Sequence, residues 1–108
     1  MNQLIFRCDI TGCYIEYILE GTVAHMNSMD IDYENMKAFF GVLRRSVDSL
    51  KQSNIEEISQ VVLLEDWDSF LNEKTSFRLT KTDPLTKTCE VVCCIDDFLE
   101  NFGKGVGL

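Results

Sequence analysis

The sequence has little of what secretion, membrane insertion or histidine-based catalysis requires. Proline, histidine and tryptophan each occur once in 108 residues. No apolar run approaches the roughly 20 residues that cross a bilayer, and residues 1–9 lack the charged start and apolar core of a signal peptide. We therefore expect a cytoplasmic, intracellular protein with no membrane partner. A single histidine, His25, excludes most hydrolase constellations, and we place it in a loop between a strand and a helix.

Basic residues are also scarce. Lys and Arg together number 10 against 18 Asp and Glu, which gives a net charge of −8. This balance opposes attraction to the phosphate backbone of nucleic acids and to anionic membrane surfaces. We therefore expect no direct nucleic-acid binding. A basic protein partner, or solubility alone, fits the charge better.

The five cysteines are an odd number without the spacing of a disulfide framework, which is typical of free thiols in a reducing compartment. A zinc site needs ligands that converge within about 2.3 Å of one ion. Cys89 and Cys93 share a strand face but lie roughly 13 Å apart at about 3.3 Å per residue. The sequence therefore predicts no metal site.

The length and ordinary composition predict one compact domain over residues 1–108, with no linker. Its first element is a hairpin, because apolar and polar residues alternate on both sides of the turn at 9–12. The second strand is expected over 13–23. The register that places every apolar residue on one face pairs Phe6 with Ile15, Leu4 with Tyr17 and Cys8 with Cys13.

The strongest pattern is a long amphipathic helix. Apolar residues recur at spacings of three and four from Met36 to Leu50. Asp30 and Asp32 offer N-caps, and the helix is expected to end near Asn54.

The remaining elements are shorter. A continuous apolar run at 58–64 predicts a central strand, followed by a short helix to about residue 73. Two strands flank the turn at 83–85, and a last helix, capped by Asp96 and Asp97, stops at Gly103. The order ββαβαββα predicts an α+β fold. In it a mainly antiparallel five-stranded sheet packs on one long helix as a two-layer sandwich, and that helix bridges any parallel pair.

One group of charges is not explained by folding. Lys37, Arg44, Arg45 and Lys51 share the polar side of the long helix at heptad-like spacing. They form either a solvated helix face or a docking strip for an acidic partner. Trp67 is a second candidate anchor, since aromatic residues are enriched in binding surfaces, although closing the core is the use we expect first of such an aromatic. The sequence predicts no catalytic residue and no cofactor site.

The element order from the first hairpin to the strand around Cys89 is similar to the C-terminal half of a GNAT-type acetyltransferase. In that family a glycine-rich stretch at a strand–helix junction holds the pyrophosphate of acetyl-CoA. The resemblance implies that residues 25–30 form this junction here. This stretch departs from the family's pattern because it has no glycine and ends in Asp30, whose charge repels phosphate.

Three functional hypotheses follow. The first is a non-catalytic protein-interaction or regulatory accessory domain that binds a larger protein or self-associates, and the absence of a nucleophile constellation favours it. The alternative is a small or degenerate GNAT-like acyltransferase-type enzyme with an unrecognised pocket. Saturable acetyl-CoA binding, or turnover that depends on His25 or a cysteine, would support this alternative. The third is an acidic mimic of nucleic acid.

Overall fold

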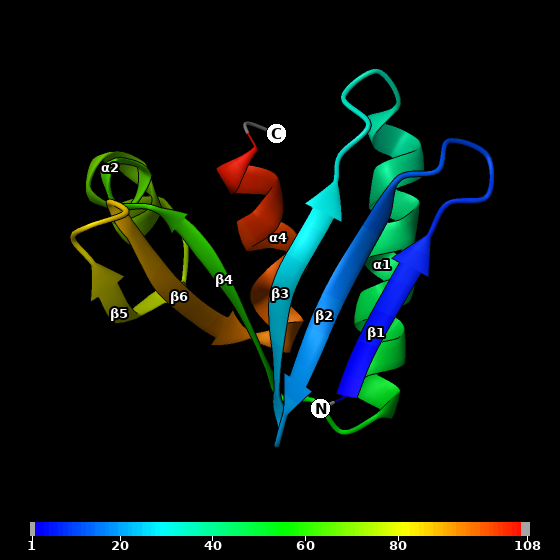
Figure 1. Ribbon diagram of the computed structural model, residues 1–108, viewed down its shortest axis with the longest axis horizontal. Coiled ribbons are helices and arrows are strands. Elements are labelled where there is room, and N and C mark those ends of the chain that lie inside the picture. Colours follow the sequence, from blue (N-terminus) through cyan, green and yellow to red (C-terminus); the bar gives the residue numbers. More distant parts are fainter. Residues whose placement is uncertain (1, 107–108) are drawn as a thin grey trace.

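The computed structural model describes residues 2–106. The chain forms three strands, one long helix, a fourth strand, a composite helix, two more strands and a last helix (Figure 1). Their bounds are β1 (Asn2–Arg7), β2 (Tyr14–Glu20), β3 (Val23–Asp30), α1 (Met36–Gln52), β4 (Glu57–Leu63), α2 (Leu64–Asp66), η1 (Trp67–Leu71), α3 (Asn72–Lys74), β5 (Arg78–Asp83), β6 (Thr88–Cys94) and α4 (Ile95–Gly105). The pieces α2, η1 and α3 follow one another without a break and make one helix over 64–74 with a π-helical middle.

The six strands form one mixed sheet in the order β1-β2-β3-β4-β6-β5. Every neighbouring pair is antiparallel except β3 and β4, which are parallel and are joined by α1. The α+β class is therefore confirmed. The predicted five-stranded sheet on one long helix is wrong in detail, because the sheet has six strands and three helices accompany it.

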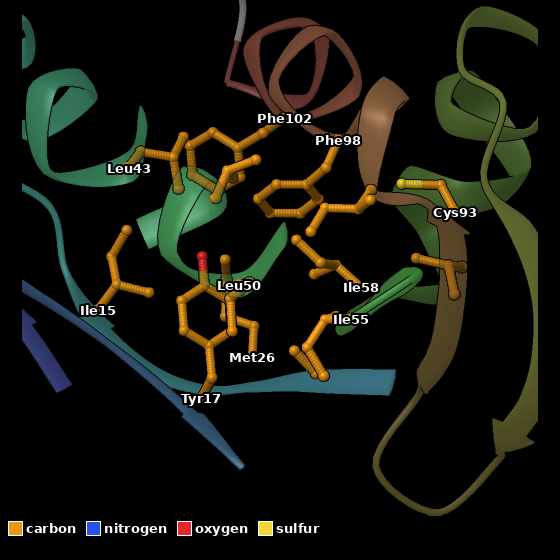
Figure 2. Close-up of a cluster of buried hydrophobic side chains, with 14 of the residues drawn as sticks. Ile15, Tyr17, Met26, Leu43, Leu50, Ile55, Ile58, Cys93, Phe98 and Phe102 are labelled. Atoms are coloured by element: carbon orange, nitrogen blue, oxygen red, sulfur yellow. The ribbon is translucent and has the colours of Figure 1, made fainter. Parts of the chain in front are cut away.

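The core lies between one face of the sheet and the helices α1 and α4 (Figure 2). Side chains from β2, β3, β4 and β6 meet those of the two helices there, among them Ile15, Tyr17, Met26, Leu43, Leu50, Ile58, Cys93, Phe98 and Phe102. The buried hydroxyl of Tyr17 lies 2.9 Å from Ser46 Oγ on α1, so its polar end is satisfied inside the core. The opposite side of the sheet, called the open face below, carries the exposed side chains of Val61 and Leu63.

The first hairpin has the predicted register, with Phe6 opposite Ile15 and Leu4 opposite Tyr17. The second predicted strand was too long, because the chain turns at residues 21–22 and returns as β3. Gly21 has a φ of 60°, a left-handed conformation that glycine adopts without strain. His25 therefore lies inside a strand and not in the predicted loop.

The helix ends also differ from the prediction. Asn35 caps α1, with its side chain accepting from Ala38 N, so neither Asp30 nor Asp32 is the N-cap. The predicted end near Asn54 is confirmed, since Ser53 is the C-cap. Helix α4 does not stop at Gly103. Within residues 2–106, no helix combines the length and the apolar character that crossing a bilayer requires.

Candidate functional site

The parallel strands β3 and β4 pair over a short stretch and then separate. Val23, Ala24 and His25 face Glu57, Ile58 and Ser59, and no further residues of the two strands pair. Figure 1 shows the strands meeting at one end and diverging toward the other. Each strand keeps its outer neighbour, β2 or β6, so the split opens inside the sheet and not at its edge.

A β-bulge in β3 accompanies the split. Tyr17 of β2 faces Met26 and Glu16 faces Ser28, which leaves Asn27 without a partner in β2. A bulge bends its strand and increases the local twist. The side-chain amide of Asn27 donates to Glu16, which also accepts from Gln3 at 2.5 Å, so polar side chains of the open face hold the bulged residue.

The space between the diverging strands is a groove of about 290 Å³. We call it the β3–β4 groove; its lining consists of Met26, Asn27, Ser28, Met29, Gln60 and Val61. None of these side chains is charged. The facing backbone edges of the two strands pair with no other strand here, so they can bond an extended ligand that carries amide groups, as an added strand would.

Gln60 also lines a second cavity, on the helix side. That cavity has a volume of about 240 Å³ and lies against the helix 64–74 and α4, with Phe70, Leu71 and Phe102 in its wall. Gln60 lines both spaces. Its Oε1 is buried and has no hydrogen-bond partner among the described residues. A buried acceptor without a partner is uncommon, because leaving it unpaired costs free energy.

A hydrogen-bonded array of three side chains lies at the closed end of the groove. His25 and Ser59 form the last pair of the β3–β4 ladder, and Ser59 Oγ lies 2.5 Å from His25 Nδ1. Glu20 Oε1 lies 3.4 Å from His25 Nε2. Ser59 is 3% exposed, whereas the imidazole is half-buried and the carboxylate faces solvent. With Nε2–H donating to Glu20, Nδ1 is the basic nitrogen and accepts from the serine hydroxyl.

The cysteines do not form a comparable site. All five are free thiols, and none of them lines the β3–β4 groove. Burial raises the pKa of Cys93 to about 11 and also raises that of Cys89, so both stay protonated near neutral pH. Hydrogen bonds from Thr11 lower the pKa of Cys8, which lies in the turn between β1 and β2.

Carboxylates surround the start of α1. The Oδ1 of Asp32 accepts from the backbone N–H of Glu34 at 3.1 Å and from that of Asn35 at 3.2 Å. The side chain of Asn35 accepts from the N–H of Ala38 at 3.3 Å. Asp30 adds a further exposed carboxylate at the end of β3. Three backbone donors at and just before the start of α1 are therefore bonded to the protein's own side chains and not free for an anion.

The structure separates the predicted contact residues from this groove. Lys37, Arg44, Arg45 and Lys51 are all exposed on α1, but two of them have structural partners. Lys51 pairs with Asp96 of α4 at 3.0 Å, and Arg45 donates to the backbone carbonyl of Arg7 at 3.1 Å. None of the four lines the groove, and their role in binding a partner stays a prediction.

Trp67 lies in the composite helix, half-buried, and packs against the core. Sequence reasoning missed Asn27, Gln60 and the pair of His25 with Ser59. No local signal joins these last two residues, which are 34 positions apart.

Comparison with known proteins gives a likeness of fold. No protein-family profile matches the sequence, and no curated protein is significantly similar to it. Among solved structures, the chain is similar to an acetyltransferase from Bacillus cereus ATCC 14579, with a TM-score of 0.59 and 10% identity over 86% of this chain and 73% of that one. It is also similar to an acetyltransferase of the GNAT family from Staphylococcus aureus Mu50, with a TM-score of 0.57 and 16% identity over 87% of this chain and 69% of that one.

This likeness contradicts the first functional hypothesis. A non-catalytic, regulatory or accessory protein-interaction domain was expected because the sequence has no nucleophile constellation. Both solved structures are acetyltransferases, which supports the alternative, an acyltransferase-type enzyme. The expectation rested on the absence of a local motif, and a groove formed by diverging strands from residues far apart in the chain leaves no such motif.

Proposed function

We propose that this protein is an acyltransferase-type enzyme that holds an acyl thioester in the β3–β4 groove and transfers the acyl group to an amine. The observation that carries the proposal is the split between β3 and β4 after three paired residues, with Asn27 bulged at its side. The fold likeness to two acetyltransferases supports the same reaction class.

The groove suits the arm of a thioester. An extended amide-bearing chain can bond the free edges of both strands, and the uncharged lining favours a neutral arm. The buried Oε1 of Gln60 provides an acceptor for an amide N–H of the ligand. The helix-side cavity is predominantly apolar, with Asp66 its single charged residue, and the groove is lined by equal numbers of apolar and uncharged polar side chains.

The array at the closed end provides a proton acceptor for the amine. As the amine nitrogen bonds to the thioester carbonyl carbon, its proton passes to Ser59 Oγ, whose own proton passes to His25 Nδ1. The carbon–sulfur bond then breaks and the thiolate leaves. The proton held by His25 passes through solvent to the thiolate, so the thiol is released and the imidazole is neutral again. Glu20 holds the imidazole in orientation and stabilises its cationic form. The net charge of −8 favours the approach of a cationic amine, which gives one proton to solvent before it attacks as the neutral amine.

A matched pair of substitutions on β4 tests the groove. Val61 lines it and is 61% exposed, whereas Leu63 lies two residues further on the same face, is 52% exposed and does not line it. We expect Val61→Trp to fill the groove and to reduce acyl transfer from a thioester to primary amines by about tenfold or more, equivalent to about 1.4 kcal/mol. Leu63→Trp should leave transfer unchanged. Loss of the thioester and formation of the amide are followed by mass spectrometry.

His25→Gln tests the proton acceptor in the same assay. A general base contributes about 100-fold or more to turnover, so kcat should fall by about that factor while thioester affinity stays the same. Absence of transfer by the unaltered protein, for every thioester and amine pair, would contradict the proposed function. Equal activity of both tryptophan variants would remove the groove from it.

A further inference from the structure

The carboxylates at the start of α1 bear on which thioester the groove accepts. We propose, on the basis of the proposed function, that the acyl donor is the thioester of an uncharged, amide-bearing thiol, with no pyrophosphate at the amino-terminus of α1. Acetyl-CoA, which the fold likeness implies, presents such a pyrophosphate, and the residues at this junction do not fit it.

The first reason is that three backbone donors at this junction are already used. The N–H groups of Glu34 and Asn35 donate to the carboxylate of Asp32, and the N–H of Ala38 donates to the side chain of Asn35. Asp32 thus brings a negative charge to the residues just before the helix start, where it repels an anion that approaches the helix N-terminus. The junction 25–35 also contains no glycine, so side chains keep a ligand away from the backbone.

The second reason is charge. Asp30, Asp32 and Glu34 bring three negative charges to this junction, and Lys37 is the one cation in the first turns of α1 that follow it. Two unit charges about 4 Å apart repel by roughly 1 kcal/mol even in water, which corresponds to about a fivefold loss of affinity. Two or three such pairs make the loss tenfold or more. Salt reduces this repulsion because all three carboxylates are accessible to solvent.

The third reason is that the two spaces lined by Gln60 offer no basic side chain to compensate. No Lys or Arg lines the β3–β4 groove or the helix-side cavity. The groove lining is uncharged and includes an unpaired buried acceptor, Gln60 Oε1, which matches an amide N–H and not a phosphate oxygen.

The test compares kcat/KM for acetyl-CoA with that for S-acetyl-pantetheine, which ends in a hydroxyl where CoA continues into phosphates. We expect acetyl-pantetheine to be used at least about tenfold better at low salt, and the difference to shrink as salt is added. The triple variant Asp30→Asn, Asp32→Asn, Glu34→Gln should raise kcat/KM for acetyl-CoA about tenfold and leave the value for acetyl-pantetheine unchanged. Asparagine at 32 still accepts the two backbone bonds.

A matched control separates local from overall charge. Asp9→Asn, Asp48→Asn and Glu73→Gln, all exposed and outside both cavities, change the net charge by the same amount, from −8 to −5. These control substitutions should not change the ratio of kcat/KM between acetyl-pantetheine and acetyl-CoA. A preference of tenfold or more for acetyl-CoA would overturn the inference while leaving the proposed acyl transfer intact. Absence of turnover with both donors would overturn both.

Discussion

Replacing Gln60 by methionine should make the folded protein more stable and donor binding weaker. The Oε1 of Gln60 is buried without a hydrogen-bond partner among residues 2–106. A buried acceptor without a partner lowers the free energy of unfolding by about 1–3 kcal/mol. We expect a value near the lower end of this range because the residue as a whole is half-buried. Methionine has nearly the same shape and no polar atom that needs a partner. The free energy of unfolding should rise by about 1 kcal/mol, and Tm by about 4–8 °C for a domain near this size.

The same substitution removes the acceptor that the ligand uses. One hydrogen bond contributes about 1 kcal/mol, so affinity for S-acetyl-pantetheine should fall about fivefold. Stability is measured by urea unfolding and affinity by titration calorimetry. Gln52→Met, at the exposed end of α1, is the control and should change neither. A less stable Gln60→Met protein with unchanged affinity would refute the reasoning, because it would make Gln60 a structural residue.

Two further predictions concern titrating groups in the core. Burial raises the pKa of Tyr17 to about 12 from its ordinary value near 10, so the contribution of its neutral phenol to stability is complete below pH 10 and is lost as the pH rises to 12. In Tyr17→Phe, the free energy of unfolding should not show this loss of roughly 2–3 kcal/mol, as measured by urea unfolding at pH 10 and at pH 12. An equal loss in the variant and the unaltered protein would contradict the prediction. Burial also raises the pKa of Cys93 to about 11, whereas its neighbour Cys94 is exposed. Iodoacetamide near neutral pH should label Cys94 and spare Cys93 until the protein unfolds, and equal labelling by peptide mass spectrometry would refute the burial argument.

The elements that sequence reasoning predicted well are those with an uninterrupted period. The first hairpin alternates strictly, and its register follows from that alternation. Helix α1 keeps a spacing of three and four along its buried side. In both, one local pattern is sufficient because one face is buried along the whole element.

Strand β3 was missed because the bulge breaks its period. Ala24 and Met26 point to the core at a spacing of two, but Met29, opposite Ile15, follows at a spacing of three. The extra residue, Asn27, shifts the alternation by one position. A strand with such a shift resembles a loop in sequence, so the missed element is also the one that forms the groove.

The candidate site depends on separations that no local pattern records. The groove lies between β3 and β4, which are separated in the sequence by the whole of α1. It forms because the backbones of the two strands diverge. The acidic junction was visible in the sequence, and its repulsion of phosphate was anticipated. That the carboxylate of Asp32 accepts the backbone N–H groups required the structure.

The most direct test of the groove is an NMR titration of the isotope-labelled protein with a thioether analogue of S-acetyl-pantetheine, which cannot transfer its acyl group. The account predicts saturable binding, with the largest amide shifts at residues 26–29 and 60–61 and none of that size in Val61→Trp. Absence of saturable shifts, or shifts centred on the basic residues of α1, would contradict it.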